Sequence, residues 1–364
     1  MSAFRGLTWD HPRGYAALRA AAGDLVAWDT HPLEGFESHP IDDLCARYDL
    51  VVLDHPHLGD AVVTGCLTPL DDLFTADELA GWAAASIGST MRSYAYAGRQ
   101  WALPLDAATQ VCAARADLVG EPPSTWDEVE RVSRTAPVAL TLAGPHAFLT
   151  FASIAVALGE EPAADPDRLL STGTGLAVLD LMASIDAHAP PWTRPLNPIG
   201  LLELMSTADE VALCPLVYGY VTYAGRLTFS DAPAATPGGR PGSTLGGTGI
   251  AISSRCTPTT ALLDHVRWLM SPEAQTRFLP EHAGQPSARA AWSDPALDAA
   301  AGGFYRRTAR TCETAWVRPR HPGYIAFQAA ASALIRDALA GLVGHRRCLD
   351  RLQELYRRRE RTRG

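Results

Sequence analysis

The alternation of short apolar segments with helical segments in the first part of the chain most restricts the folds open to it. The pattern predicts strands over residues 4–9 and 25–28, with a helix over residues 12–22 between them. The continuous apolar run of residues 50–53 is typical of a strand that is buried on both faces. Because strands that alternate with helices form parallel sheets covered by helices, the sequence predicts an α/β fold.

Composition excludes several classes of function. The formal net charge is -9, whereas a protein that binds nucleic acid without sequence preference needs a basic surface. The chain contains arginine but no lysine, so it can form neither a lysine Schiff base nor a phosphate-binding P-loop. A Gly-x-Gly-x-x-Gly motif after a strand is also absent from the sequence. We therefore expect no nucleic-acid partner and no cofactor.

The residue types that bind metals lack the spacing of a metal site. The cysteines are scattered without a Cys-x-x-Cys spacing, which favours reduced, buried thiols over a disulfide framework or a zinc site. His55 and His57 could chelate a metal only if the chain were extended there, and the sequence offers no evident third ligand. The sequence therefore predicts no metal site.

The beginning of the sequence lacks the apolar segment and cleavage site of a secretory signal. The sequence also lacks a run of about 18 apolar residues, so we expect no transmembrane segment. As written, the sequence therefore predicts a cytoplasmic protein. If a signal segment had been removed from the chain, the protein would instead be periplasmic or extracellular.

Two Asp-His pairs follow predicted strands of the same sheet: Asp10-His11 comes after Trp9, and Asp54-His55 comes after the buried apolar run. Because the carboxyl ends of parallel strands meet at one edge, we expect both pairs to face the same crevice. There the carboxylates would accept hydrogen bonds from a ligand, the imidazoles would donate or accept them, and the indole would stack on a sugar face or a planar group. Alternatively, each pair only caps a helix or forms a turn.

Three parts of the chain, taken together and in this order, indicate a protein family. Residues 96–109 and 122–128 form the first, residues 246–253 and 268–275 form the second, and residues 338–341 belong to the third, a C-terminal helical region. Together they resemble the extracellular solute-binding proteins of the carbohydrate-uptake type, which are the substrate receptors of ABC importers. The first part is similar to the family's crossing between lobes, and the second resembles the return crossing and the following helix.

This resemblance implies a two-lobed fold of the periplasmic-binding-protein type, with a hinge and an interlobe cleft. It assigns residues 1–107 and 254–305 to lobe one, and residues 108–253 and 306–364 to lobe two. The ligand would lie between the lobes, which would close on it by hinge bending.

The resemblance also adds candidate ligand contacts beyond the Asp-His pairs. In lobe two, Arg318, Arg320 and His321 could bind a carboxylate or a phosphate, or could instead form an interlobe ion pair. Trp316 could stack on the ligand. Further candidates lie near the crossings or in lobe two, where packing of the hinge or of the core is an equally good explanation: Asp106, Tyr218 and Gly247.

Two functions fit these residues. The first is a binding module that closes on a sugar, a sugar acid or a small carboxylate without chemistry, with an ABC permease as its partner if it is exported. The second is a cytoplasmic enzyme on the same scaffold, in which His11, His55 and Asp54 perform acid–base chemistry of the dehydratase, isomerase or decarboxylase type. In the enzyme, an arginine would anchor the carboxylate of the substrate.

Overall fold

The first lobe is built around a mixed β-sheet with the strand order β2-β1-β3-β10-β6 in the computed structural model, which describes residues 3–361. The strands are β1 (Phe4–Trp9), β2 (Val26–His31), β3 (Leu50–Leu53), β6 (Leu103–Asp106) and β10 (Thr248–Ile252). Strands β1, β2 and β3 run parallel, and β10 runs antiparallel to both β3 and β6. The predicted α/β fold is therefore confirmed.

Strand β3 explains why an apolar run without alternation predicts a doubly buried strand. Leu50 and Val52 pack in one apolar cluster with α1 and α12, whereas Val51 and Leu53 pack in another with α3 and α4. Successive side chains of a strand point to opposite faces, so both faces of β3 need apolar residues. The helices that cover the two faces are α1 (Pro12–Ala22), α12 (Thr260–Leu269), α3 (Ile41–Cys45) and α4 (Leu58–Thr64).

Further helices and a hairpin complete the first lobe. The helices are α2 (Leu33–Ser38), α5 (Ala76–Ala85), α6 (Thr90–Ser93), α13 (Leu279–Glu281), α14 (Arg289–Trp292) and α15 (Pro295–Ala300). A small hairpin is formed by β4 (Ala95–Tyr96) and β5 (Arg99–Gln100).

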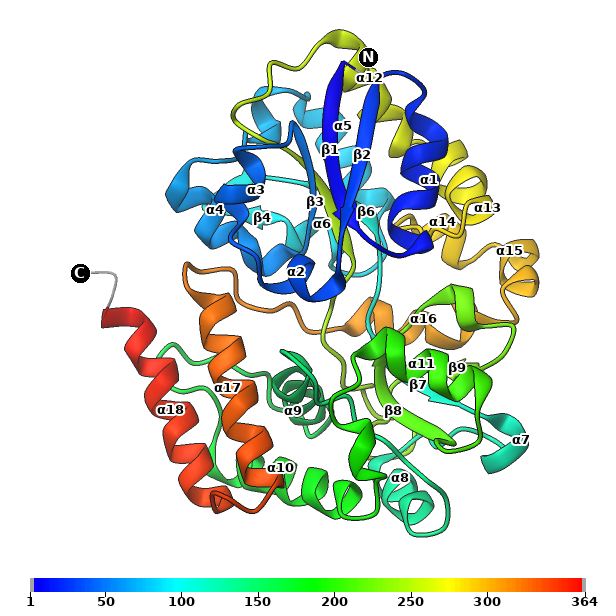
Figure 1. Ribbon diagram of the computed structural model, residues 1–364, viewed down its shortest axis with the longest axis vertical. Helices are drawn as coiled ribbons and strands as arrows, with labels where there is room; N and C mark the ends of the chain where they lie inside the picture. The colour runs from blue at the N-terminus through cyan, green and yellow to red at the C-terminus, as the bar shows by residue number, and fades with distance from the viewer. Residues whose placement is uncertain (1–2, 362–364) are drawn as a thin grey trace.

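The second lobe contains an antiparallel sheet with the order β8-β7-β9. Its strands are β7 (Gln110–Ala114), β8 (Leu213–Tyr218) and β9 (Thr228–Ser230). Its helices are α7 (Ala116–Val119), α8 (Trp126–Ser133), α9 (His146–Ala157), α10 (Thr172–Asp186), α11 (Pro198–Thr207), α16 (Phe304–Thr314), α17 (Tyr324–Leu339) and α18 (His345–Arg361). Helix α9 is buried along its length because α10 and α17 pack against it, as the lower half of Figure 1 shows.

The chain crosses between the upper and lower lobes of Figure 1 after β6 and again before β10. The two crossings touch, since the backbone N–H of Gly246 donates to the backbone oxygen of Ala108 at 2.8 Å. Gly247 has a φ of 88°, and an added Cβ would lie 2.5 Å from the backbone oxygen of Asp106. The hinge therefore needs glycine at position 247.

The return crossing lies before Thr248, whereas we expected residues up to 253 to belong to lobe two. Residues 248–252 form β10, which pairs with β3 and β6 in the sheet of the first lobe. Ile250 and Ile252 pack in the same apolar cluster as Leu50. Burial of these two side chains therefore assigns the strand to lobe one.

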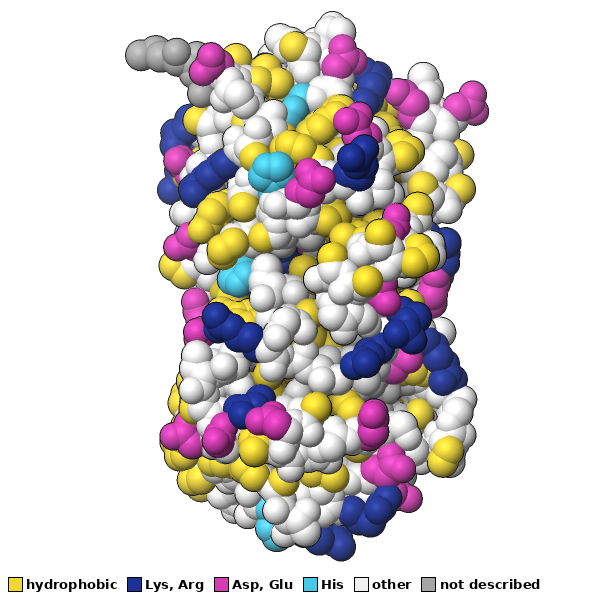
Figure 2. Space-filling model, turned by 90° about the vertical axis from the view of Figure 1, so that its right-hand side faces the viewer, with side chains coloured by type: hydrophobic (Ala, Val, Ile, Leu, Met, Phe, Trp, Pro, Cys, Tyr) yellow, Lys and Arg dark blue, Asp and Glu magenta, His cyan; other side chains and the backbone are white. Residues whose placement is uncertain are grey.

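Among the described residues, no helix combines the length and the apolar character that a bilayer crossing demands. Residues 3–361 also contain no group of three or more His, Cys, Asp and Glu side chains arranged to hold a metal ion. Acidic and basic side chains are mixed over the face of the molecule in Figure 2.

Candidate functional site

A small pocket lies between the two lobes, next to the carboxyl ends of β1 and β3. The first lobe contributes one wall: Trp9, Arg13, Leu33, Phe36, Glu37 and Asp54. The second lobe and the hinge contribute the other: Ala108, His146, Pro198, Tyr218, Tyr220 and residues 246–248. The cavity volume is about 50 Å³, so the lobes are closed on one another.

Aromatic rings and unpaired polar atoms together line this pocket. The ring centroids of Trp9 and Phe36 lie 5.5 Å apart. Within the described residues, Trp9 Nε1, Tyr218 Oη and Thr248 Oγ1 are buried without a hydrogen-bond partner. Burial raises the pKa of Tyr218, so its hydroxyl stays protonated at neutral pH and can both donate and accept. Because a buried polar atom without a partner is unfavourable, these atoms mark positions where polar groups of a ligand would be stabilised.

Arg13, in the first turn of α1, is held by partners from both lobes. Its Nε and Nη2 donate to Asp106 Oδ2 and Oδ1 at 2.7 and 2.6 Å, and its Nη1 donates to the backbone oxygen of Gly219 at 3.1 Å. Its Cζ also lies 4.3 Å from the ring centroid of Tyr220. Burial alone would lower the pKa of Arg13, but the carboxylate of Asp106 raises it above its ordinary value. The guanidinium is therefore charged and already paired.

Asp54, directly after β3, joins the first lobe to the second through Arg318. Arg318 Nη2 donates to Asp54 Oδ2, and the backbone N–H of His55 donates to Asp54 Oδ1 at 2.8 Å. Burial alone would raise the pKa of Asp54, but the charge of Arg318 lowers it well below its ordinary value. Of the two roles left open for Arg318, the structure shows the interlobe ion pair.

Glu37 and His146 form another contact between the lobes. Glu37 lies on α2, His146 is the first residue of α9, and Glu37 Oε1 lies 3.1 Å from His146 Nε2. The imidazole is almost fully buried, and neither of its ring nitrogens has a partner in hydrogen-bond geometry among residues 3–361. Sequence analysis missed both residues and Arg13, because none of them belongs to a motif and only closure of the lobes brings them to one pocket.

The structure places part of the predicted site at this pocket. Asp106 and Arg318 lie directly behind its lining, where they pair with Arg13 and Asp54. The neighbouring parallel strands β1 and β3 bring Trp9 and Asp54 to one edge, as the strand pattern predicts. The predicted residues that line the pocket itself are Trp9, Asp54, Tyr218 and Gly247.

The histidines of the two Asp-His pairs lie outside the pocket lining. His11 caps α1, since its Nδ1 accepts from the backbone N–H of Arg13 at 3.1 Å, and its ring packs edge-on against Tyr220. His55 is completely buried, because a 3₁₀ turn begins at this residue directly after Asp54. Burial is the main reason why the pKa of each histidine is lowered to about 4. The acid–base groups of the enzyme hypothesis therefore do not converge on one pocket.

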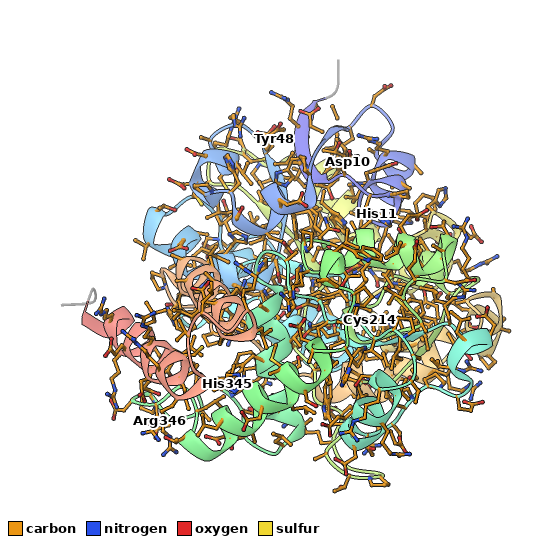
Figure 3. The ribbon with its side chains drawn as sticks, turned by 60° about the horizontal axis from the view of Figure 1, so that its bottom comes forward. Asp10, His11, Tyr48, Cys214, His345 and Arg346 are labelled. Carbon is orange, nitrogen blue, oxygen red and sulfur yellow. The ribbon has the colours of Figure 1, made fainter. Side chains whose placement is uncertain are left out.

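The remaining candidates are also placed elsewhere. Asp10 is exposed at the end of β1, beside His11 in Figure 3. Trp316 is buried against α9. Arg320 Nη1 donates to backbone oxygens of α6 and β4 at 2.6 and 2.7 Å, and His321 Nδ1 lies 2.9 Å from the backbone oxygen of the next residue. None of these four side chains lines the pocket. Asp10 lies on the surface, Trp316 belongs to the core, and Arg320 joins the two lobes.

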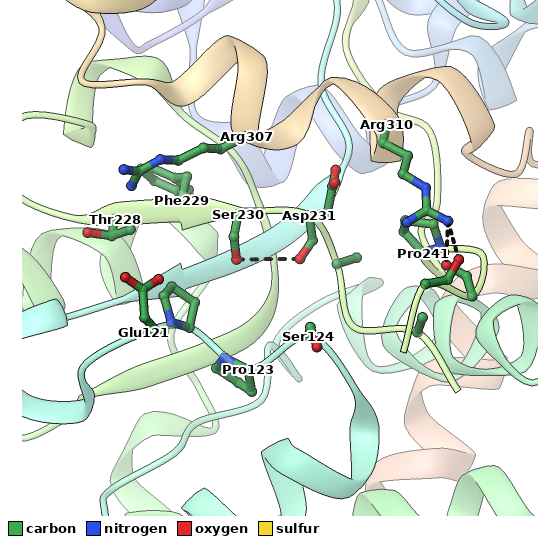
Figure 4. A pocket seen from close by; sticks show the side chains of 15 residues that line it. Glu121, Pro123, Ser124, Thr228, Phe229, Ser230, Asp231, Pro241, Arg307 and Arg310 are labelled. Atoms are coloured by element: carbon green, nitrogen blue, oxygen red, sulfur yellow. Dashed lines mark hydrogen bonds between the residues drawn. The ribbon is translucent and has the colours of Figure 1, made fainter. Parts of the chain in front are cut away.

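A larger hollow lies on lobe two alone, as Figure 4 shows. Its volume is about 330 Å³, and it is bordered by β9, α16 and residues 121–124. Arg310 at its border donates to the backbone oxygens of Gly238 and Gly239, both at 2.7 Å. A ligand bound there would not bridge the lobes, so the interlobe pocket is the better candidate site.

Comparisons with known proteins agree with this architecture. The model of the bacterial extracellular solute-binding protein family matches residues 44–296, which is more than half of the chain. No curated protein matches the chain.

Several solved structures are similar over nearly the whole chain. The ABC transporter solute-binding protein from Agrobacterium radiobacter K84, in complex with ribitol, has a TM-score of 0.81 at 22% identity and covers 98% of each chain. A solute-binding protein from Thermotoga lettingae TMO, bound with α-D-tagatose, has a TM-score of 0.82 at 15% identity, over 99% of this chain and 100% of that one. T. maritima MalE3 with maltose has a TM-score of 0.79 at 17% identity, over 97% and 98%. These likenesses confirm the predicted two-lobed fold.

Proposed function

Because this chain belongs to the bacterial extracellular solute-binding protein family, we propose that it binds a sugar or a polyol in the pocket between its lobes. The similar proteins from A. radiobacter, T. lettingae and T. maritima are bound to ribitol, tagatose and maltose. We further propose that the protein acts outside the cytoplasm, as the receptor of an ABC importer.

The combination of rings and unpaired polar atoms in one interlobe pocket is the observation that carries this proposal. A sugar has apolar C–H faces, which pack on rings such as those of Trp9 and Phe36, and hydroxyls that both donate and accept. Tyr218 Oη, Thr248 Oγ1 and His146 Nδ1, which have no hydrogen-bond partner among the described residues, would each gain one from such a ligand. Since the two walls belong to different lobes, the ligand would join them.

Ligand entry would require the lobes to open, because the closed pocket has a volume of only about 50 Å³. Opening at the hinge would separate Asp54 from Arg318 and Glu37 from His146. A ligand that contacts both walls binds the closed state better than the open one, and so shifts the population toward closure.

A ligand screen tests the proposal. The protein is heated with ribitol, D-mannitol, D-galactose or maltose, and each hit is titrated by calorimetry. A ligand present at 100 times its Kd adds about 2.7 kcal/mol to the free energy of unfolding, so Tm should rise by several degrees. The ligand recovered after incubation should be chemically unchanged in its NMR spectrum. If no neutral sugar or polyol raises Tm or gives a binding isotherm, the proposal is wrong.

Replacing Tyr218 by Phe should lower the affinity for the ligand without lowering the thermal stability of the protein. Tyr218 Oη has no hydrogen-bond partner within the described residues, so its removal should leave Tm nearly unchanged. If the hydroxyl binds the ligand, affinity should fall roughly 3- to 10-fold, which corresponds to one hydrogen bond.

Tyr356→Phe is the matched control for this substitution. Its hydroxyl donates to the backbone oxygen of Asp165 at 2.9 Å within lobe two, so its loss should lower Tm and leave affinity unchanged. Equal affinities of the Tyr218→Phe variant and the wild type would contradict the assignment of Tyr218 to the site.

A further inference from the structure

The charges around the interlobe pocket point to an uncharged ligand. We propose that Glu37, in contact with His146 across the lobes, makes this pocket select uncharged polyhydroxy ligands and reject the carboxylate forms of the same sugars. This inference rests on the proposed function and names the ligand class within it. It also gives Glu37 the role of a specificity-determining residue.

The first observation is that Arg13 is not free to bind an anion. Its side chain is 3% exposed, and Asp106 already holds both Nε and Nη2 in the two-point geometry that guanidinium groups use for carboxylates. Its remaining terminal nitrogen donates to the backbone oxygen of Gly219. A ligand carboxylate could reach this guanidinium only by displacing a buried partner.

The second observation is that Arg318 is occupied in the same way. It donates to Asp54 from behind the pocket wall, and Asp54 is the member of the pair that lines the pocket. The pair therefore presents a carboxylate, and not a guanidinium, to a ligand. Arg13 with Asp106 and Arg318 with Asp54 each sum to zero net charge.

The third observation is that Glu37 lacks such compensation. Its side chain lines the pocket, is 17% exposed, and forms no ion pair with an arginine in the part of the chain that the structure describes. Its polar contact is the imidazole of His146 at 3.1 Å. The other charged residues of the lining, Asp54 and Arg13, are already paired with Arg318 and Asp106. The uncompensated charge that faces a ligand is therefore negative.

This arrangement favours hydroxyl groups over carboxylates for a physical reason. A hydroxyl can donate to Glu37 or to the unpaired Nδ1 of His146, and it can also accept from Tyr218. A ligand carboxylate can only accept, would be desolvated next to a like charge, and would find each pocket guanidinium already paired. Repulsion of this kind is a common source of specificity between otherwise similar ligands.

The test compares matched neutral and acidic ligands by calorimetry at pH 8. The pairs are ribitol with D-ribonate, D-mannitol with D-mannonate, D-galactose with D-galacturonate, and maltose with maltobionate. They are titrated into the wild type, Glu37→Gln and Glu34→Gln. Glu34 is the matched control, because it lies on the same helix, does not line the pocket, and accepts a hydrogen bond from Asn197 Nδ2.

The expected result is that at least one neutral ligand binds the wild type and that its acid binds at least tenfold more weakly. In Glu37→Gln this ratio should shrink at least threefold, whereas Glu34→Gln should keep the wild-type ratio. An acid that binds the wild type as tightly as its neutral partner overturns the inference but leaves the proposed function standing. The wild-type comparison alone decides this point, even if Glu37→Gln fails to fold.

Two other outcomes also count against the inference. A ratio that is the same in wild type and Glu37→Gln overturns the role given to Glu37. Binding of no member of the panel overturns the proposed function itself, and the inference falls with it.

Discussion

Replacing Asp54 by Asn tests whether the buried ion pair with Arg318 holds the lobes together. The substitution keeps the shape of the side chain and the acceptor for the backbone N–H of His55, but it removes the negative charge. The Arg318 side chain is 3% exposed and the Asp54 side chain 15%, so the guanidinium would remain charged in a place that water hardly reaches.

Removing one partner of a buried ion pair typically destabilises a protein by about 3–5 kcal/mol. The Asn side chain still offers Arg318 a neutral acceptor, and Gln328 Oε1 remains at 3.4 Å from its Nη1, so we expect the lower end, about 3 kcal/mol. Urea unfolding followed by circular dichroism at pH 7 measures this loss. Asp29→Asn is the control, because the Arg5–Asp29 pair is exposed and should contribute little.

The lobes could relieve the unpaired charge by opening, which would return Arg318 to water. In that case the loss of stability would be smaller, and small-angle X-ray scattering would show a larger radius of gyration for the variant. The double variant Asp54→Asn/Arg318→Gln should recover most of the lost stability, because no charge is then left buried. A loss below about 1 kcal/mol together with an unchanged radius of gyration would refute the reasoning.

Two further predictions concern Gly247 at the hinge and the buried His55. Gly247→Ala should lower the free energy of unfolding by about 3 kcal/mol, because the new Cβ would lie 2.5 Å from the backbone oxygen of Asp106. Gly65→Ala is the control: Gly65 has a φ of 63°, but an added Cβ would meet no atom within 4 Å, so the loss should be only about 1 kcal/mol. Urea unfolding measures both losses. The folded-state pKa of His55 is lowered to about 4 from an ordinary 6.5, so its neutral form contributes stability above pH 6.5 that is lost as pH falls toward 4, by about 3 kcal/mol. His55→Gln should flatten this part of the stability–pH curve, and an unchanged slope would show that His55 is not its source.

The sequence alone predicted the parallel strands of the first lobe and the sheet edge next to which the pocket lies, but it assigned β10, an inner strand of the same sheet, to lobe two. Residues 50–53 are apolar without alternation because helices cover both faces of β3, and the alternation of strands and helices predicted the parallel pairing. Parallel pairing in turn brings Trp9 and Asp54 to one edge, where both line the pocket. Local patterns suffice for these features because strand geometry and burial act over a few residues.

The sequence did not determine which polar side chains face the pocket. Arg318 and Arg320 are two residues apart, yet one pairs with Asp54 and the other donates to backbone oxygens of the first lobe. Glu37 and His146 show no motif and meet because α2 and α9 come from opposite lobes. These contacts depend on how the two lobes close on each other, and a pattern along one stretch of chain carries no information about that closure.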